Sequence, residues 1–429
     1  MSRLIVVGGG WAGCSAALAA AKKGLPVTLV ERTDRLLGSG LVGGIMRNNG
    51  RFTAAEELKL MGGGDLVELT DTLSRHANLN FPGHRHAWLY DIERIEGAVI
   101  RLLKKWSVKV CYKKRAVEVE LAGRRIAAIR LADGGTIKGE IFIDASGTAG
   151  PMAHCRRFGN GCSMCIFRCP SFGSRVSIAI KAGLKERMLR REDQQPGFFS
   201  GSCELEPGSL DRRLLSEVRK KGAVVLPVPP GLWPGGPGRS LLKAKVCRQY
   251  TRQEYADNLV LLDTGPIKIM APYFSLRKLR RLDGLREAVY RDPLAGGIGN
   301  SIRFTSSIAV EADLLVPPFS NLLAAGERAG LMVGHTEAMV TGTLAGYNAW
   351  RLTRGEKPLS LPGDTACGEL IAFGREVMTG PEEGREMYTL SGGTLWKNLL
   401  RKGLYSTDPA ELRPRLQKAG LLSLFTHMS

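Results

Sequence analysis

A glycine-rich turn directly after the first apolar segment places the strongest constraint on this chain. Residues 4–7 (LIVV) are apolar and mostly β-branched, as expected for a buried parallel strand. Residues 8–13 (GGGWAG) follow, and residues 12–23 (AGCSAALAAAKK) have the small, helix-forming composition of a helix packed closely on its neighbours. Residues 27–30 (VTLV) form a second apolar segment that ends at Glu31. This order predicts a βαβ unit.

Each part of this unit has a physical role in binding a pyrophosphate. Gly8 permits the tight turn, Gly10 lets the backbone approach the phosphates, and Gly13 lets the helix lie close to the strand. The helix N-terminus offers N–H groups and the positive end of its dipole to the phosphates. An acid at the end of the second strand accepts hydrogen bonds from a ribose 2′-OH. We therefore predict a dinucleotide site that includes Gly8, Gly10, Trp11, Ala12, Gly13 and Glu31.

The same region has an uncharged run from Leu4 to Ala21, long enough to resemble a membrane helix or the core of a signal peptide. Three consecutive glycines, Gly8 to Gly10, break a helix where the run should be most regular, and the βαβ unit explains all of it. Since no other segment is long and apolar enough to span a bilayer, we expect no membrane span and a cytoplasmic location. The nine cysteines are clustered, unlike an evenly spread disulfide framework.

A second glycine-rich stretch follows Glu31 and lets the backbone pass close to a longer, buried cofactor. In this feature the chain resembles the glutathione-reductase-like FAD proteins. The resemblance implies FAD as cofactor. The residues of this stretch expected near it are Arg32, Gly38, Gly40, Gly43 and Gly44.

Further signatures of these FAD proteins recur along the chain. Residues 91–103 have a helical period, and residues 117–119 and 126–129 alternate or run apolar like strands around the hairpin signal at residues 133–135. Residues 141–147 (IFIDASG) resemble the family strand that ends in D-A-[ST]-G beside the adenosine. The resemblance adds Val117, Ala145, Ser146 and Gly147 to the expected cofactor contacts.

The second half of the cofactor site is expected far along the chain. Residues 319–325 read as a strand, and the resemblance places the following Gly326 and Glu327 at the ribitol and pyrophosphate. A helix is expected to run to about Arg354, with the N–H groups of Gly342 and Thr343 pointing towards the flavin. His335 is a candidate general acid or base there, although a surface or capping role is an alternative. The other candidate histidines are His84, His86 and His154.

Residues 321–352 (NLLAAGERAGLMVGHTEAMVTGTLAGYNAWRL) and 358–370 (PLSLPGDTACGEL) resemble the closing segment of the GidA/TrmFO family of flavoproteins, which modify uridines in tRNA. The resemblance implies an FAD-dependent enzyme with a small-molecule or RNA substrate, and tRNA binding through a basic surface. It also implies redox chemistry, for which NAD(P)H is a candidate electron donor. The chain departs from TrmFO-type proteins at residues 41–44 (LVGG), where those proteins have a cysteine in L-V-C-S-N-S.

Four cysteines fall within 15 residues: Cys155, Cys162, Cys165 and Cys169. The spacing Cys-x2-Cys-x3-Cys-Pro matches the latter part of a ferredoxin-type cluster motif, which predicts these four as ligands of a 4Fe–4S iron–sulfur cluster. Three alternatives stay open. The cysteines bind zinc, or Cys162 and Cys165 are redox-active or nucleophilic thiols near the flavin, or the side chains are packed in the core.

The charge balance, 61 Lys and Arg against 41 Asp and Glu, gives a net charge of +20, which attracts polyanions. Basic runs concentrate at residues 212–221 and 277–281. Leu276, Leu279, Leu282 and Leu285 repeat every third residue, which predicts one amphipathic helix with a basic face. Such a face either binds an anionic substrate or is simply solvated.

Together these features predict an α/β protein with a Rossmann-like FAD-binding domain, made of a parallel sheet with helices and a three-stranded β-meander. Residues 1–150 and 301–362 are expected to form this domain, residues 151–300 an inserted α+β substrate domain with the cysteines, and residues 363–429 a helical C-terminal tail. Three functions stay open: an enzyme of the GidA/TrmFO type, a flavin and iron–sulfur electron-transfer protein with a redox partner, and an RNA-binding protein that retains FAD structurally.

Overall fold

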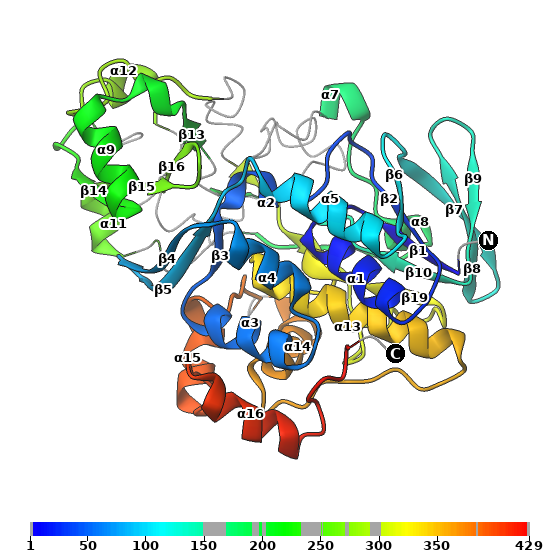
Figure 1. Ribbon diagram of the computed structural model, residues 1–429. Helices are drawn as coiled ribbons and strands as arrows, with labels where there is room; N and C mark the ends of the chain where they lie inside the picture. The colour runs from blue at the N-terminus through cyan, green and yellow to red at the C-terminus, as the bar shows by residue number, and fades with distance from the viewer. Residues whose placement is uncertain are drawn as a thin grey trace.

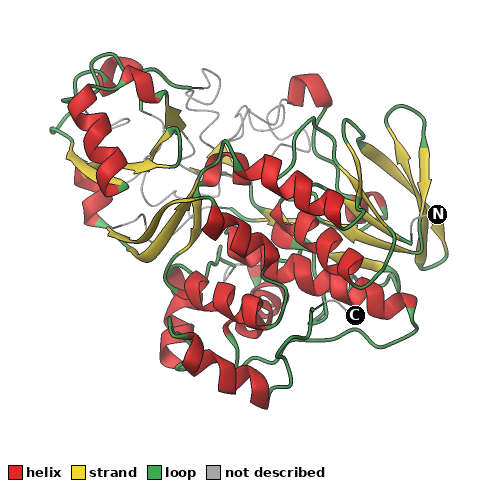
Figure 2. Ribbon diagram, in the orientation of Figure 1, coloured by secondary structure: helices red, strands yellow, loops and turns green. Residues whose placement is uncertain are grey.

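A computed structural model describes residues 3–148, 169–190, 197–199, 203–232, 250, 252–270, 274–291, 302–382 and 385–426 (Figure 1). His154 and the cysteines at 155, 162 and 165 lie outside these residues, and of Cys169 only the backbone is described. Figure 2 shows a large α/β body with a smaller lobe of strands and helices at its upper left.

The centre of the molecule is a five-stranded parallel sheet, and the predicted α/β class is confirmed. Leu4 pairs with Ile141 on one side and with Val27 on the other, so the two strands of the glycine-turn unit are neighbours. The strands lie in the order β19 (Leu322–Ala324), β10 (Ile141–Asp144), β1 (Leu4–Val7), β2 (Val27–Val30) and β6 (Lys109–Cys111). The first four are buried along their whole length because side chains pack on both faces of the sheet.

Two long-separated helices, α1 (Trp11–Lys22) and α13 (His335–Thr353), lie side by side against this sheet (Figure 1). A Cβ added at Gly342 would lie 2.2 Å from the Ala12 carbonyl oxygen, and one at Gly346 would lie 2.1 Å from that of Ala16. The small residues therefore permit the close helix contact that joins the two segments of the cofactor domain. Helix α5 (Ile95–Lys105) and the antiparallel meander complete this body, the meander consisting of β7 (Ala116–Ala122), β8 (Arg125–Leu131) and β9 (Thr136–Lys138).

Residues 40–90 add a second sheet between the body and the smaller lobe. Its strand order is β3 (Ile45–Arg47), β5 (His84–Tyr90) and β4 (Ser74–Phe81), all antiparallel. Three helices accompany it: α2 (Gly40–Gly43), α3 (Gly50–Leu60) and α4 (Asp65–Thr72). The buried side chains of Phe81 and Leu89 pack against Val260 and Leu262 of the lobe.

The lobe has its own core and forms the inserted unit, here defined as residues 203–291. Its four-stranded antiparallel sheet has the order β13 (Cys203–Leu205), β16 (Ile267–Ile269), β15 (Asn258–Asp263) and β14 (Ala223–Pro227). Its α-helices are α9 (Arg212–Lys221), α11 (Gln253–Asp257) and α12 (Leu276–Leu279). The boundary expected at residue 151 is too early, because Ile178 and Leu189 pack into the core of the large body.

The prediction of one amphipathic helix over residues 276–285 is wrong. Helix α12 ends after four residues, and turns follow. Leu279, Leu282 and Leu285 are nevertheless buried in the core of the inserted unit. A repeat of three therefore identified the buried side chains, while the turns that contain Asp283 and Gly284 interrupt the helix.

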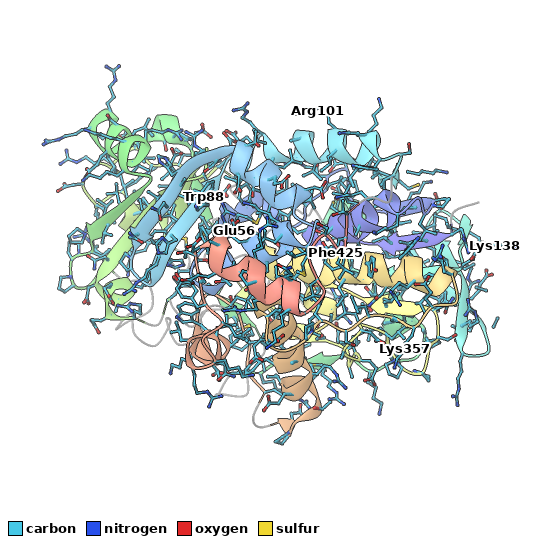
Figure 3. The ribbon with its side chains drawn as sticks, turned by 60° about the horizontal axis from the view of Figure 1, so that its bottom comes forward. Glu56, Trp88, Arg101, Lys138, Lys357 and Phe425 are labelled. Carbon is cyan, nitrogen blue, oxygen red and sulfur yellow. The ribbon has the colours of Figure 1, made fainter. Side chains whose placement is uncertain are left out.

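Short elements lie before and after the inserted unit. Two short helices, α7 (Cys169–Phe172) and α8 (Ile178–Lys181), precede it. Two short strands before the unit pair with two after it: β11 (Arg187–Met188) with β18 (Ser306–Ser307), and β12 (Phe198–Phe199) with β17 (Ile302–Arg303). The C-terminal tail is helical as predicted, with α14 (Ala366–Thr379), α15 (Gly393–Arg401) and α16 (Pro409–Lys418). Phe425 packs edge-on against Tyr347 of α13, with ring centroids 5.3 Å apart (Figure 3).

Within the described ranges, no helix combines the length and the apolar character that crossing a membrane requires.

Candidate functional site

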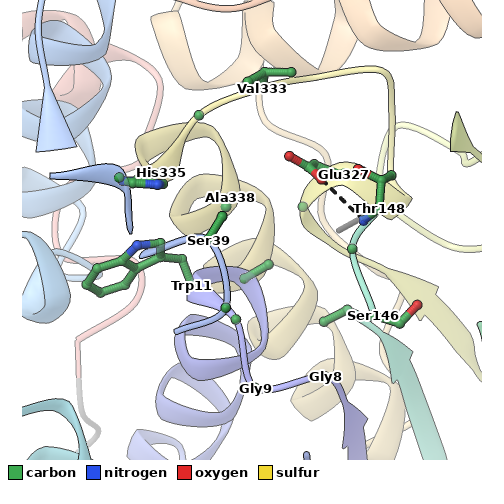
Figure 4. A pocket seen from close by; sticks show the side chains of 18 of the residues that line it. Gly8, Gly9, Trp11, Ser39, Ser146, Thr148, Glu327, Val333, His335 and Ala338 are labelled. Atoms are coloured by element: carbon green, nitrogen blue, oxygen red, sulfur yellow. Dashed lines mark hydrogen bonds between the residues drawn. The ribbon is translucent and has the colours of Figure 1, made fainter. Parts of the chain in front are cut away.

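A pocket that is partly open to solvent lies where the two segments of the cofactor domain meet the inserted unit. Figure 4 shows its wall, with Trp11 and His335 on one side and Ser146, Thr148 and Glu327 on the other. The predicted residues that line it are Gly8, Gly10, Trp11, Ala12, Glu31, Arg32, Gly38, Gly43, Ala145, Ser146, Gly147, Gly326, Glu327 and His335.

The glycine turn has the shape that a pyrophosphate requires. Gly8 has a φ of +108°, and an added Cβ would lie 2.4 Å from the carbonyl oxygen of Ala145. A Cβ at Gly13 would lie 1.8 Å from the carbonyl oxygen of Gly8, so only glycine lets α1 begin so close to β1. At Gly10, by contrast, nothing lies within 4 Å of the added Cβ, because this residue faces the pocket. The first turn of α1 contains no acidic residue, which leaves its positive dipole end available to phosphate.

Glu31 holds the loops on either side of it. Its Oε2 accepts a hydrogen bond from the backbone N–H of Gly9 at 2.8 Å, and its Oε1 accepts from the backbone N–H of Thr33 at 2.8 Å. The carboxylate also lines the pocket beside Arg32. Glu31 therefore positions the glycine turn as well as lying where the ribose is expected.

Glu327, on the wall across from His335, joins the two chain segments that form the site. The Thr148 hydroxyl donates to Glu327 Oε2, and the Thr148 backbone N–H donates to the same oxygen at 3.2 Å (Figure 4). Thr148 follows β10 and Glu327 follows β19, so the contact lies at the carboxyl ends of two parallel strands. Ligands of α/β sheets bind at this edge.

His335 is the first residue of α13, and its ring lies among aromatic side chains. The ring centroids of Trp11 and Tyr90 are each 6.0 Å from that of His335. The Tyr90 hydroxyl donates to the carbonyl oxygen of Gly40 at 2.6 Å, so its oxygen is an acceptor for His335 Nδ1 at 3.4 Å. Burial raises the pKa of Tyr90, which keeps the phenol protonated at neutral pH. This network assigns the proton to Nδ1 of His335 and the acceptor role to Nε2.

The inserted unit supplies a wall of the pocket that sequence reasoning did not predict. This wall contains the cation Lys268, the aromatic residue Tyr250 and the thioether Met270. All three are at most 6% exposed. The one available signal was a single lysine between two isoleucines at residues 267–269.

Tyr250 is held from behind by a buried histidine. His84 Nδ1 lies 2.9 Å from the carbonyl oxygen of Pro82, which only accepts, so Nδ1 carries the proton. His84 Nε2 therefore accepts from the Tyr250 hydroxyl at 3.2 Å. Burial lowers the pKa of His84 to about 3 and keeps the ring neutral. Among the candidate histidines, His84 thus contacts a pocket residue without lining the pocket itself, while the partly buried His86 contacts Asn78 at 2.7 Å.

A buried ion pair stabilises the N-terminal turn of α13. Arg51 donates from Nε to both carboxylate oxygens of Glu337 at 2.9 Å, and the Glu337 side chain is fully buried. Arg51 also donates to the carbonyl oxygen of Val333 at 2.7 Å. Arg51 lines the pocket, so this pair fixes one wall next to His335. The partners of Arg51 are more than 280 residues away in the chain, so no local sequence pattern indicated this ion pair.

Several expected contacts lie elsewhere. Gly342 and Thr343 are in the middle of α13, where backbone N–H groups belong to the helix, and the expectation that they point at a flavin is wrong. The helix begins at His335, so the N–H groups of its first turn are those that face the pocket. Gly13 and Gly40 support the wall from behind, Gly44 packs on Thr264, and Val117 lies in the meander strand β7.

The cysteine prediction falls on residues outside the described ranges. Among the residues that are described, no group of three or more His, Cys, Asp or Glu side chains is placed to hold a metal ion. The described free cysteines include Cys14 and Cys367, which are buried. Burial raises the pKa of both thiols, so they act as packing side chains.

The pocket fits a dinucleotide with a long, planar second half. The glycine turn and the α1 N-terminus suit the pyrophosphate, Glu31 suits the ribose, and the space continues to His335 and Lys268. The fold and the pocket define an FAD-dependent flavoprotein of the oxidoreductase class.

Comparisons with known proteins agree. The family model described as FAD dependent oxidoreductase matches residues 4–155, and that of glucose inhibited division protein A matches residues 270–357. The chain is 26% identical to the methylenetetrahydrofolate–tRNA-(uracil-5-)-methyltransferase TrmFO of Pelotomaculum thermopropionicum over 86% of each chain. It is 28% identical to TrmFO of Aquifex aeolicus over 44% of this chain and 41% of that protein.

A solved structure, that of Aquifex aeolicus GidA, shares the fold with a TM-score of 0.62 at 15% identity, covering 97% of this chain and 76% of that one. The chain is thus similar to the TrmFO flavoproteins in sequence and to GidA in fold, and it carries an FAD-dependent oxidoreductase domain.

Proposed function

We propose that this protein is an FAD-dependent oxidoreductase whose substrate is RNA of the tRNA type. One observation carries the proposal: the flavin-type pocket is closed on one side by a wall from the inserted unit, which also has a strongly basic outer surface. The TrmFO relatives are named for activity on tRNA, which supports the same substrate class. A cytoplasmic location follows from this substrate.

Bound FAD supplies two-electron transfer at its isoalloxazine ring. The chain's own residues bind and orient it. The glycine turn from Gly8 to Gly13 and the α1 dipole hold the pyrophosphate, and Glu31 and Glu327 hold the ribose and ribitol ends. Trp11 and Tyr250 exclude water from the parts of the pocket that they line, because both are buried aromatic residues.

His335 is the residue placed to move a proton. Its Nδ1–H is directed at the Tyr90 hydroxyl, which leaves Nε2 as the atom that accepts a proton from a reacting group or returns it.

The basic surface of the inserted unit is formed by exposed side chains on α9 and around α12: Arg212, Arg213, Lys220, Lys221, Arg277, Arg280, Arg281 and Arg286. Acidic side chains also lie among them: Asp211, Asp283 and Glu287 are exposed, and Glu217 pairs with Lys221 at 2.6 Å. Phosphate groups of RNA bind such a surface by Coulomb attraction and release counterions.

Redox chemistry on RNA fits the pocket better than methyl transfer through a cysteine. Where TrmFO-type proteins carry a cysteine, this chain has Gly43, and a Cβ there would lie 1.8 Å from His335 Cε1. The ring of His335 therefore fills the space that a side chain at position 43 would need.

A second candidate, electron relay between FAD and a metal cluster, rests on the cysteine spacing. Thr148, just before the cysteines, lines the pocket, and Gly173, just after them, accepts a hydrogen bond from pocket residue Arg32 at 2.6 Å. Described residues on both sides of the cysteines therefore lie at the pocket or contact a residue that lines it. In this candidate Cys155, Cys162, Cys165 and Cys169 hold an iron–sulfur cluster, NAD(P)H is the donor, and a redox protein is the acceptor.

The test begins with anaerobic purification of the full chain and quantification of flavin and iron per chain. We expect one FAD per chain, and binding of tRNA that weakens steeply between 50 and 200 mM salt. Stoichiometric iron that is lost in Cys162→Ser and Cys165→Ser would favour the relay. A flavin-free protein that stays so after reconstitution overturns both candidates.

The RNA surface has a matched pair of variants. Lys220→Glu with Lys221→Glu changes the last turn of α9, and Lys104→Glu with Lys105→Glu changes the last turn of α5, which is equally exposed. We expect about tenfold weaker tRNA binding and a salt slope reduced by about 2 only for the first pair. Equal effects in both pairs would mean that the attraction is non-specific.

A further inference from the structure

Side chains alternate between the two faces of β16, so Lys268 lies outside the core of the inserted unit. Ile267 and Ile269 are fully buried in that core, so Lys268, between them, points to the opposite face of the sheet. That face looks onto the pocket, which Lys268 lines. Only 5% of Lys268 is exposed, which is uncommon for a lysine.

A hydrogen bond holds the ammonium group at this place. Lys268 Nζ donates to the carbonyl oxygen of Val42, the residue before Gly43. Directly across the ladder, Glu204 of β13 is paired with Lys268, so their side chains share one face. The charge of Glu204 reaches the pocket side of the sheet, since it adds to the burial that raises the pKa of Tyr90.

Several other charged side chains along the pocket have local partners. Arg51 is paired with Glu337, Glu31 accepts two backbone N–H groups, and Glu327 accepts from Thr148. Lys268 is the cation that the inserted unit contributes to the described pocket lining, beside Gly43 and His335, and Glu204 lies opposite it in the ladder.

We propose that Lys268 sets the reduction potential of the bound flavin, with Glu204 moderating its charge. This inference rests on the proposed function, because it needs FAD in the pocket. Oxidised flavin accepts two electrons and one proton as a hydride from a reduced donor, and the ring then carries one negative charge. A fixed cation in a low-dielectric site stabilises that charge more than it stabilises the neutral oxidised ring. The inserted unit thereby tunes the cofactor held by the other domain.

The test measures the flavin potential of purified, FAD-loaded full-length protein against a reference dye during anaerobic reduction by dithionite. In Lys268→Met we expect the reduction equilibrium to fall about tenfold, which is about 30 mV for a two-electron couple. Lys268→Arg keeps the cation and is expected to stay within about threefold of the wild type. Glu204→Gln removes the opposing charge and is expected to raise the potential.

The opposite signs of the two charge removals separate electrostatics from structural damage, which would move both variants alike. If Lys268→Met does not fold, Glu204→Gln still tests the proposal. Lys138→Met, which changes an exposed lysine of the meander strand β9, is the matched control and is expected to leave the potential unchanged. Flavin that binds with the same potential in Lys268→Met and Glu204→Gln overturns this inference alone, whereas a wild type that binds no flavin overturns the proposed function as well.

Discussion

At the scale of single residues, the site depends on where a side chain is absent. Gly8 and Gly13 are required because neighbouring carbonyl oxygens occupy the space of a Cβ, and Gly10 leaves the pocket open. Gly43 is required for a similar reason, because the ring of His335 occupies the space that a Cβ there would need. Each of these positions places a backbone or a ring within reach of the cofactor, so the smallest substitution acts directly on binding.

Gly13→Ala is expected to weaken FAD binding at least tenfold. The added methyl would lie 1.8 Å from the Gly8 carbonyl oxygen, so the start of α1 must move away from the turn. A fluorescence titration of the apoprotein with FAD measures the change. Gly208→Ala is the control, because nothing lies within 4 Å of its Cβ, and it should bind FAD as the wild type does.

At the scale of elements, a buried ionic cluster attaches the segment of α8 and β11 to the cofactor domain. Glu186 Oε1 accepts from Arg175 at 3.0 Å and from Arg328, which is fully buried. Burial alone would raise the pKa of Glu186, but the two guanidinium charges outweigh it and lower the pKa to about 2. The usual value for a glutamate is 4.5.

From this cluster we predict that the folded protein loses stability at acidic pH. A carboxylate with a lowered pKa adds stability that is fully present above about pH 4.5 and is lost as the pH falls towards 2. Urea unfolding between pH 5 and pH 3 should show a loss that is smaller in Glu186→Gln, by about 2 kcal/mol. At pH 7 the same variant should be less stable by about 3–5 kcal/mol, because two buried guanidinium groups lose their partner. An identical pH profile in both proteins would contradict this account.

At the scale of the whole molecule, one buried pair joins three distant parts of the chain. Arg51 lies in the first turn of α3 and Glu337 in the first turn of α13. Glu337 Oε1 accepts from the backbone N–H of Leu390 at 2.9 Å and from the hydroxyl of Thr389 at 2.8 Å. The C-terminal tail is therefore attached to the pocket wall by a polar network as well as by packing.

Glu337→Gln is expected to destabilise the protein by about 3–5 kcal/mol, because the buried Arg51 loses its counter-charge. Chemical unfolding measures the loss, and limited proteolysis should cut earlier within residues 385–426. Glu376→Gln changes an exposed glutamate on the tail helix α14 and serves as control, with a change of less than about 0.5 kcal/mol expected. Equal stability of the two variants would show that the network does not hold the tail.

The local parts of this protein were predictable from its sequence. The glycine turn, the strands at residues 4–7, 27–30 and 141–144, and the hairpin at residues 133–135 depend on sterics and alternation over a few residues. The short α12 was not predictable in this way, since the same repeat of three is compatible with a helix and with successive turns.

Tertiary structure alone decided which side chains complete the pocket. Lys268, Tyr250 and Arg51 reach it because a sheet face, an aromatic cluster and a buried ion pair bring together residues that are hundreds of positions apart. Such contacts depend on how whole elements pack, and no short-range pattern encodes that packing. The amino-acid sequence by itself determined the phosphate end of the site, because glycine sterics and the helix dipole act locally, and the packing of the inserted unit decided the charge at the other end.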